Sequence, residues 1–166
     1  DTVARLGGDE FTILLDDIVD TSDALNCVKR IQSELSLPVE INGNQVFTGC
    51  SIGIVMANPN YTAAADLLRD ADIAMSRAKE KRQAGYELFD QAMYDQSMRR
   101  LQLENDLRAS LKKQEFELYY QPIISLQDQS LLGFEALVRW QHPSDGLINP
   151  GEFIHIAEET GLIVPI

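Results

Sequence analysis

The spacing of apolar residues changes several times along this chain, and each spacing predicts a different structural element. Apolar and β-branched residues at positions 3–6 and 11–15 predict two short strands. The Gly7-Gly8 pair between them allows positive φ angles, so we expect a tight hairpin with a two-residue turn. The chain therefore opens with a predicted β-hairpin.

Helical spacing follows in two later stretches. Residues 21–38 and 63–81 carry an apolar side chain every three or four positions, which predicts amphipathic helices. Thr21 or Ser22 is expected to cap the first of them. Residues 39–57 predict strands joined by an Asn-Gly turn, and a short strand follows the second helix, so the order β-β-α-β-β-α-β indicates an α+β fold. The side chains expected on the buried faces are Leu25, Val28, Ile31 and Leu35 in the first helix, and Leu68, Ala71, Met75 and Ala78 in the second.

The character of the sequence changes at Asp90. No Gly or Pro interrupts the next two dozen residues, which predicts one long helix with Asp90 as its cap. Such a helix would span about 36 Å and could link two domains, although a surface helix packed on one domain is an alternative interpretation. Its apolar row consists of Leu103, Leu107 and Leu111. We therefore divide the chain into residues 1–90, a connecting helix at 91–113 and residues 114–166.

Two alternating runs follow the long helix, at residues 116–124 and 133–143, and predict a pair of strands. A last helix is expected from Asn149, its cap, to Gly161, its terminator, with Pro150 at the first helical position. The second strand is expected to pack its apolar face against helices. That face consists of Phe134, Ala136, Val138 and Trp140, and the opposite face of Glu135, Leu137 and Arg139.

Composition limits the class of protein. With 45% hydrophobic and 24% charged residues, the 166-residue chain is typical of a globular protein and has room for one domain or parts of two. Its 26 acidic and 14 basic residues give a formal charge of −12, so nucleic acid is not an expected partner. No apolar run reaches the roughly 20 residues that cross a bilayer, so we expect no membrane contact within the segment. Cys27 and Cys50 lack metal-binding spacing and fit a reducing cytoplasm.

Paired carboxylates follow the hairpin glycines directly. Asp9 and Glu10 are expected to open the second strand with their side chains on opposite faces. Hard oxygen ligands beside exposed backbone N–H groups suit a magnesium-bound phosphate. Acidic residues beside a turn are also commonly just solvated, and the four letters GGDE alone do not choose between these two interpretations.

A second candidate site lies on the strand at residues 133–143. Glu135 and Arg139 share one face and stand about 13 Å apart along it. If that face points into a barrel or cleft, the carboxylate needs a partner such as a metal ion, and the arginine suits a phosphate. A Glu–Arg pair across neighbouring strands is an equally good interpretation.

Two families resemble the chain in succession. The motifs DTVARLGGDEF at the start, SIGI at 51–54 and ADIAMSRAK at 71–79 resemble the C-terminal part of a GGDEF, or diguanylate cyclase, domain. The pieces LENDLRASL, YYQPIISL, GFEALVRWQHPSDGLINPGEFI and AEETGLI resemble the start of an EAL, or cyclic di-GMP phosphodiesterase, domain. The resemblance implies a nucleotide-cyclase-like α+β sheet, joined by the long helix to the first β-β-α elements of a TIM-like (β/α)8 barrel.

For the GGDEF part, the resemblance implies GTP bound through Mg²⁺ or Mn²⁺ at the hairpin. Asp9 matches a metal ligand, and Glu10 matches a catalytic acidic residue. Gly7 and Gly8 match the glycines that admit the phosphates, and Lys79 matches a lysine that contacts them. Two such domains face one another in this family, which implies a homodimer.

For the EAL part, the resemblance implies cyclic di-GMP as the ligand. Glu135 matches the catalytic motif glutamate, which is a divalent-metal ligand. Gln121 and Arg139 match positions that touch the cyclic dinucleotide. The other metal ligands of the family would lie beyond residue 166, so we expect the isolated segment to be inactive.

Three functions are compatible with these motifs. A protein that hydrolyses cyclic di-GMP to linear pGpG, with a GTP-binding regulatory GGDEF half, ranks first because Gln83 and Ser76 replace an arginine and a tyrosine usual in cyclases. An active diguanylate cyclase or a bifunctional enzyme ranks second, on the intact GGDEF string. The third is a non-catalytic nucleotide-sensing or interaction module. All three place the segment in the cytoplasm, with any membrane anchor of the parent protein outside it.

Overall fold

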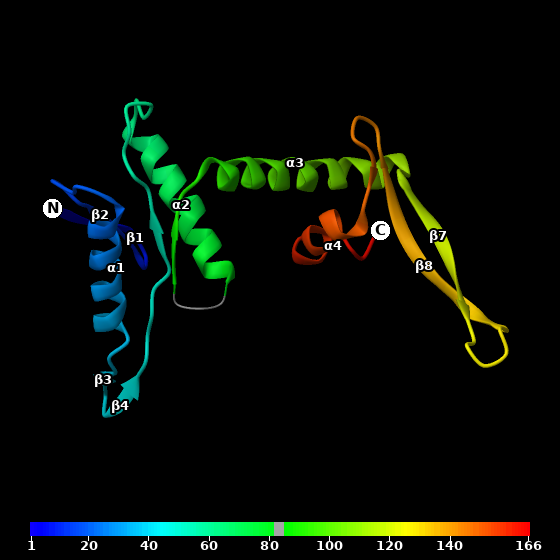
Figure 1. The fold of residues 1–166 in the computed structure, drawn as a ribbon, viewed down its shortest axis with the longest axis horizontal. Helices are drawn as coiled ribbons and strands as arrows, with labels where there is room; N and C mark the ends of the chain where they lie inside the picture. Colours follow the sequence, from blue (N-terminus) through cyan, green and yellow to red (C-terminus); the bar gives the residue numbers. More distant parts are fainter. Residues whose placement is uncertain (82–84) are drawn as a thin grey trace. The chain divides into compact units, whose positions relative to one another are not determined.

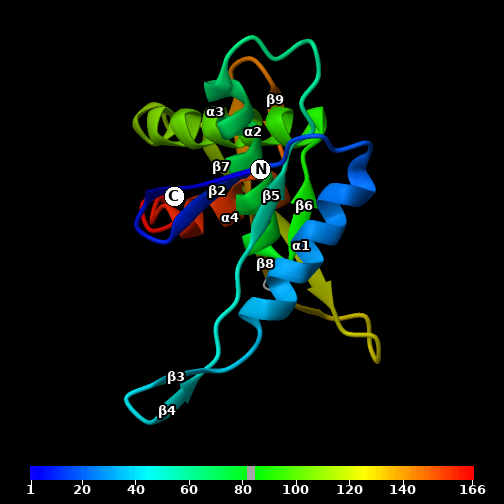
Figure 2. The ribbon, with the colours of Figure 1, turned by 90° about the vertical axis from the view of Figure 1, so that its left-hand side faces the viewer.

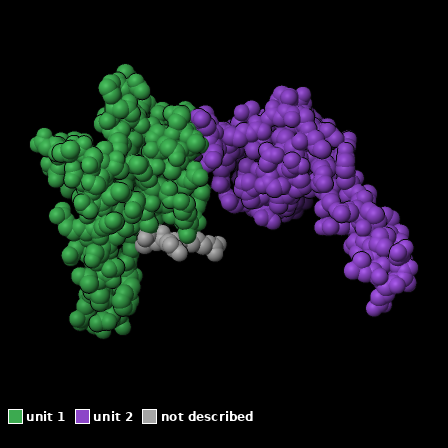
Figure 3. Space-filling model, in the orientation of Figure 1, with its two compact units in different colours: residues 1–94 green, residues 95–166 purple. Residues whose placement is uncertain are grey.

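The chain consists of two compact units. The computed structural model describes residues 1–81 and 85–166, and Gln83 therefore lies outside the described residues. The units are Asp1–Tyr94 and Asp95–Ile166 (Figure 3). Each is a mixture of helices and strands (Figure 1), as the sequence indicated.

Within the described residues, unit 1 holds three two-stranded sheets and two helices. β1 pairs with β2 and β3 with β4, both antiparallel, whereas β5 pairs with β6 in parallel. The order has one strand more than predicted, because residues 47–51 leave the extended ladder and separate β4 from β5. The elements are β1 (Thr2–Gly7), β2 (Glu10–Leu14), α1 (Thr21–Leu35), β3 (Val39–Ile41), β4 (Asn44–Val46), β5 (Ile52–Ile54), α2 (Ala64–Glu80) and β6 (Tyr86–Leu88).

The β3–β4 hairpin closes on the turn that the sequence predicted. Asn42 and Gly43 have φ angles of 51° and 79°, the positive pair that Asn-Gly dipeptides favour. Figures 1 and 2 both show this hairpin extending away from β5 and α2. Its side chains Val39, Ile41 and Val46 consequently remain 42% to 52% exposed.

The cap of α1 is Asp20, and the prediction of Thr21 or Ser22 was wrong. The Asp20 Oδ1 accepts a hydrogen bond from the Ser22 backbone N–H at 2.7 Å. The Ser22 hydroxyl and this N–H together lower the pKa of Asp20. A carboxylate at this position also faces the positive end of the helix dipole, which favours it over a hydroxyl.

The buried face of α2 agrees in part with the predicted one, because Ala78 is buried and Ala71 and Met75 are half-buried. Asp70, Ala74 and Ala78 are buried, whereas Leu68 is 41% exposed. The helix packs directly on the backbone of β5, so that a Cβ added to Gly53 would contact backbone atoms of α2. Small side chains allow this close approach, and a leucine on the same face would prevent it.

The long helix α3 (Gln91–Lys113) begins in unit 1 and continues into unit 2. Its predicted cap is confirmed, because the Asp90 Oδ1 accepts a hydrogen bond from the Met93 backbone N–H at 2.9 Å. Leu103 and Leu107 are buried in unit 2, as the apolar row predicted.

Unit 2 contains an antiparallel sheet in the order β7-β8-β9. The predicted strand pair and terminal helix are present, and the three-residue β9 is an additional strand. These strands form an open sheet, and the barrel interpretation stays a prediction. The elements that follow α3 are β7 (Phe116–Ile124), β8 (Leu131–His142), β9 (Gly146–Ile148) and α4 (Pro150–Glu159).

The core of unit 2 forms around Trp140 at the end of β8. Trp140, Phe153 and Leu107 are fully buried, and the indole N–H of Trp140 donates to the Ser110 hydroxyl at 3.0 Å. Phe134, predicted on the same packed face, is 59% exposed. Only the end of β8 that reaches α4 is therefore covered on that face.

Candidate functional site

The turn of the β1–β2 hairpin carries four of the predicted site residues. Gly7 pairs with Glu10, so the turn residues are Gly8 and Asp9, and not Gly7 and Gly8 as predicted. Gly8 has a φ of 51°, which glycine adopts without steric cost. Asp9 thus lies in the turn and Glu10 at the first position of β2, and both are exposed.

A bulge in β1 explains the displaced turn. Arg5 pairs with Phe11 and Gly7 with Glu10, so that Leu6 has no partner on β2. An extra residue on one strand interrupts the regular alternation of side chains. The period-two rule assumes an uninterrupted ladder, and for this reason it placed Asp9 on the strand.

Arg5 contacts the turn from β1, although no motif in the sequence marked it as a site residue. Its Nε donates a hydrogen bond to the Gly8 carbonyl oxygen at 2.9 Å, and its Nη2 donates to the same oxygen. Its guanidinium carbon lies 5.8 Å from the centre of the Phe11 ring. The available signal was a basic residue three positions before Gly8, on a strand expected to end at the turn.

Lys79 stands apart from this turn. It is an exposed residue in the last turn of α2, and no hydrogen bond or ion pair links it to the hairpin in the described part of the chain. No atom lies within 4 Å of the position that a Cβ would take on Gly7 or Gly8. The hairpin is therefore open to a ligand on its glycine side.

In unit 2 the structure places two candidates next to each other. Gln121 on β7 and Glu135 on β8 form a directly opposed pair, in which Cβ atoms lie about 5 Å apart. Arg139 lies on the same face, opposite Glu117, with its guanidinium carbon 5.5 Å from the centre of the Tyr119 ring. The three residues that the resemblance assigned to cyclic di-GMP thus share one sheet face.

The carboxylate of Glu135 lies on the solvent-exposed part of this sheet face. The side chain is exposed rather than buried in a barrel or cleft, so burial does not force a partner on it. Among the described residues Glu135 makes no ion pair with Arg139 of its own strand, and the Glu–Arg pair that the register brings together across β7 and β8 is Glu117 and Arg139. Arg139 donates instead from Nη1 to the Val138 carbonyl oxygen at 3.0 Å.

These carboxylates suit a hard divalent ion without enclosing one. No three His, Cys, Asp or Glu side chains gather around a metal position in the described ranges 1–81 and 85–166. Asp9 and Glu10 offer carboxylate oxygens at the hairpin, and Glu135 offers them on β8. Magnesium is commonly held by one or two carboxylates together with water and substrate phosphates. The residues therefore fit Mg²⁺ or Mn²⁺ that binds together with a nucleotide.

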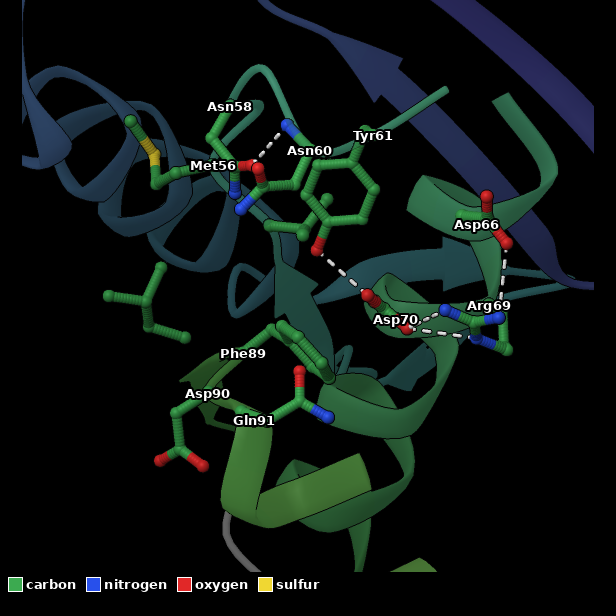
Figure 4. Close-up of a pocket in the computed structure, with 12 residues that line it drawn as sticks. Met56, Asn58, Asn60, Tyr61, Asp66, Arg69, Asp70, Phe89, Asp90 and Gln91 are labelled. Carbon is green, nitrogen blue, oxygen red and sulfur yellow. Dashed lines mark hydrogen bonds and ion pairs between the residues drawn. The ribbon is translucent and has the colours of Figure 1, made fainter. Parts of the chain in front are cut away.

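A pocket of about 610 Å³ lies at the junction of the loop after β5, the start of α2 and the start of α3 (Figure 4). Its most buried polar group is the carboxylate of Asp70, which is 4% exposed. The Tyr61 hydroxyl donates to Asp70 Oδ2 at 2.7 Å, and the Arg69 guanidinium binds both Asp70 and Asp66. No pattern in the sequence indicated this network.

The network affects the neighbouring side chains. Burial, followed by the hydrogen bond to Asp70, raises the pKa of Tyr61 to about 12. The Arg69 guanidinium carbon lies 4.9 Å from the centre of the Tyr94 ring, in the first turns of α3. All these partners are satisfied within unit 1, which indicates a structural role for the network.

Two protein families match the chain. The description "Diguanylate cyclase, GGDEF domain" matches residues 1–84, and "EAL domain" matches residues 104–166. The chain belongs to the GGDEF–EAL family. The stretch between the two matches contains β6 and the first part of α3.

Curated members of the GGDEF–EAL family match over the whole chain. MucR of Pseudomonas aeruginosa, a bifunctional diguanylate cyclase/cyclic di-GMP phosphodiesterase, is 39% identical over 100% of this chain and 24% of its own length. The cyclic di-GMP phosphodiesterase PdeR of Escherichia coli is 38% identical over 99% of this chain and 24% of its own length. A solved structure, "PaMucR Phosphodiesterase, c-di-GMP complex", is 49% identical over 38% of this chain and 26% of that chain, with a TM-score of 0.36. The chain thus spans about a quarter of the length of these relatives.

The GGDEF–EAL chain therefore presents two groups of candidate residues, one in each unit. The hairpin turn gathers the GGDEF candidates except Lys79, and the β7–β8 face gathers the EAL candidates. Separately, no helix among the described residues is long and apolar enough to cross a membrane.

Proposed function

We propose that the protein containing this chain hydrolyses cyclic di-GMP to linear pGpG through its EAL half, and that its GGDEF half binds GTP as a regulatory ligand. The observation that carries this proposal is the Gln121–Glu135 pair, with Arg139 on the same open face of β7 and β8. The family membership and the activities named for MucR and PdeR support it.

Each residue on the β7–β8 face has a separate task in this proposal. Glu135 would hold Mg²⁺ or Mn²⁺ through its carboxylate, and the amide of Gln121 would donate a hydrogen bond to the dinucleotide beside that position. The planar guanidinium of Arg139 pairs with a phosphate. A divalent ion at this carboxylate would supply the positive charge that polarises the phosphodiester. Hydrolysis adds one water across a P–O bond of the cyclic dinucleotide, which opens the ring to pGpG.

In the GGDEF half, Asp9 is the proposed ligand for the metal ion that accompanies GTP. Gly7 and Gly8 leave room for the phosphates, and Lys79 supplies a positive charge to them. Because GTP is a cytoplasmic nucleotide, we place this segment in the cytoplasm. We also propose that the protein forms a homodimer through its GGDEF or EAL half.

Substitution of Glu135 tests the phosphodiesterase proposal in the full-length protein. Glu135→Gln keeps the size of the side chain but removes the anionic ligand, and we expect pGpG formation with Mg²⁺ or Mn²⁺ to fall by at least about 100-fold. Glu117→Gln, on the same face and opposite Arg139, is the matched control and should stay within a few-fold of the unaltered protein. An unaltered protein that makes no pGpG at any GTP concentration would refute the proposal.

A second candidate function is diguanylate cyclase activity, alone or beside the phosphodiesterase. The specific observation in its favour is the unobstructed turn that exposes both Asp9 and Glu10. In that reaction Glu10 would assist attack of one GTP 3′-hydroxyl on the α-phosphate of another, a step that releases the hydroxyl proton and breaks the bond to the β-phosphate, with pyrophosphate as the leaving group. Full-length protein that forms no cyclic di-GMP from GTP under dimerising conditions excludes this function. Binding of both nucleotides without any product would instead identify a non-catalytic sensing module.

A further inference from the structure

We propose that Arg5 is a positioning residue for the nucleotide site: it fixes the central peptide of the hairpin turn so that the Asp9 N–H faces the ligand side. The inference rests on the proposed binding of GTP at this turn. It is carried by the two hydrogen bonds from the Arg5 guanidinium to the Gly8 carbonyl oxygen.

The geometry of the peptide bond converts these hydrogen bonds into an orientation. The described residues contain no cis peptide bond, and in a trans peptide the carbonyl and the following N–H point in opposite directions. Because Arg5 holds the Gly8 oxygen on its own side, the Asp9 N–H must point away from Arg5. An outward N–H beside a glycine is a donor for a phosphate oxygen.

The turn has an alternative state that Arg5 disfavours. Two-residue hairpin turns of types I′ and II′ differ in the orientation of this central peptide, and only type I′ needs positive φ at both positions. Here Gly8 has a φ of 51°, while Asp9 is not among the residues with positive φ. Aspartate enters the left-handed region more readily than most residues. The alternative orientation is therefore accessible, and in it the Asp9 N–H would point toward Arg5.

The position of Arg5 is itself held by the strands. Its partner across the ladder is Phe11, whose ring lies under the guanidinium, and the unpaired Leu6 separates it from the turn. A planar guanidinium presents two donors to one oxygen while its face contacts a ring, which the single ammonium of lysine does not do. An arginine at this place is thus specifically suited to hold the turn carbonyl.

Two other roles for Arg5 predict different behaviour. If Arg5 bound a nucleotide phosphate directly, it would matter only when the nucleotide is present. If it only stabilised the hairpin, its loss would change the turn without changing nucleotide affinity. A positioning role predicts both effects together.

The experiment measures both effects in the full-length protein with ¹⁵N-labelled glycine and aspartate. We compare Arg5→Ala and Arg5→Lys with Arg30→Ala, which removes an exposed arginine of α1. Without nucleotide, the amide signals of Gly8 and Asp9 should move in both Arg5 variants and not in Arg30→Ala. The affinity for Mg·GTP, measured by calorimetry, should fall about 10-fold in Arg5→Ala, less in Arg5→Lys, and not in the control.

Lys79→Ala provides the comparison for a direct phosphate contact. It should weaken Mg·GTP binding while leaving the Gly8 and Asp9 amide signals of the free protein in place. The inference is overturned if the Arg5 variants lose Mg·GTP affinity with unchanged Gly8 and Asp9 amide signals. It is also overturned if these signals move while the affinity for Mg·GTP stays the same. If the unaltered protein does not bind Mg·GTP, the proposed GTP binding by the GGDEF half is wrong, and the inference about Arg5 is wrong with it. The calorimetric measurement on the unaltered protein alone identifies this outcome. Should Arg5→Ala unfold, Arg5→Lys keeps the charge and alone must show both effects.

Discussion

At the scale of single residues, burial decides which polar groups are paired. Asp70 is 4% exposed and has both Tyr61 and Arg69 as partners, as expected because an unpaired buried carboxylate is costly. Glu135 and Asp9 are exposed and lack comparable partners among the described residues. Exposed carboxylates without partners are the ones available to a metal ion and a ligand.

The Tyr61–Asp70 hydrogen bond predicts a pH dependence. The pKa of Tyr61 is raised to about 12, by burial and then by the bond to Asp70, whereas a phenol in the unfolded chain titrates near pH 10. A raised pKa favours the folded state below the unfolded value, so this stabilisation should be complete below about pH 10 and be lost as the pH rises toward 12.

The measurement is an alkaline titration followed by the ultraviolet absorbance of phenolate. One of the five tyrosines should ionise near pH 12 in the folded chain, and Tyr61→Phe should remove that step. Tyr120→Phe, at a tyrosine that is 63% exposed, is the control and should leave the step in place. If the high-pH step persists in Tyr61→Phe, it belongs to another tyrosine, and the prediction is contradicted.

At the scale of elements, α2 packs directly against the backbone of β5. A Cβ on Gly53 would lie 2.5 Å from the Met75 backbone nitrogen and closer still to the Ala71 carbonyl oxygen. Both neighbours are helical backbone atoms, which cannot yield as a flexible side chain can. The SIGI motif therefore has a packing reason for its glycine in this chain.

We predict that Gly53→Ala destabilises unit 1 by about 3 kcal/mol or more, because α2 must move away from β5. Gly151→Ala is the matched control: nothing lies within 4 Å of its added Cβ, and alanine in a helix should be neutral or stabilising by up to about 1 kcal/mol. Urea unfolding followed by circular dichroism measures both. Equal urea midpoints for Gly53→Ala and Gly151→Ala would contradict the close contact between β5 and α2.

At the scale of the whole molecule, α3 is the element that both units share. Met93 is buried in unit 1, and Leu103 and Leu107 are buried in unit 2, while residues 95–98 between them are exposed. The helix is continuous from Gln91 to Lys113. A change in its phase within the exposed stretch would rotate one set of buried side chains relative to the other.

Because α3 is continuous, we predict that the helical phase between its two buried segments matters for coupling between the units in the full-length protein. One alanine inserted after Ser97 turns everything beyond it by about 100°. If the protein has the proposed function, GTP should lose its effect on pGpG formation in this variant while basal hydrolysis remains. An insertion of seven residues adds about two full turns and should largely restore the effect. A normal GTP response in the one-residue variant would show that α3 does not couple the units.

Local elements could be predicted from the sequence to the extent that local chemistry decides them. The Asn42-Gly43 turn, the Asp90 cap and the apolar row of α3 follow from neighbouring residues, and the structure bears them out. The turn at Gly8-Asp9 was displaced by one residue because a bulge depends on pairing between two strands, which no single strand reveals. The exposure of Leu68 on α2 depends likewise on the segments against which the helix packs.

The sequence by itself determined the family, most of the helices and strands, and the residues available for chemistry, since motifs and periodicity are properties of nearby residues. Only the tertiary structure decided which of those residues meet. It opposed Gln121 to Glu135 through the register of two strands, brought Arg5 to the Gly8 carbonyl across a bulge, and enclosed Asp70 between Tyr61 and Arg69. These contacts depend on register and burial, which arise only when separate segments pack against one another.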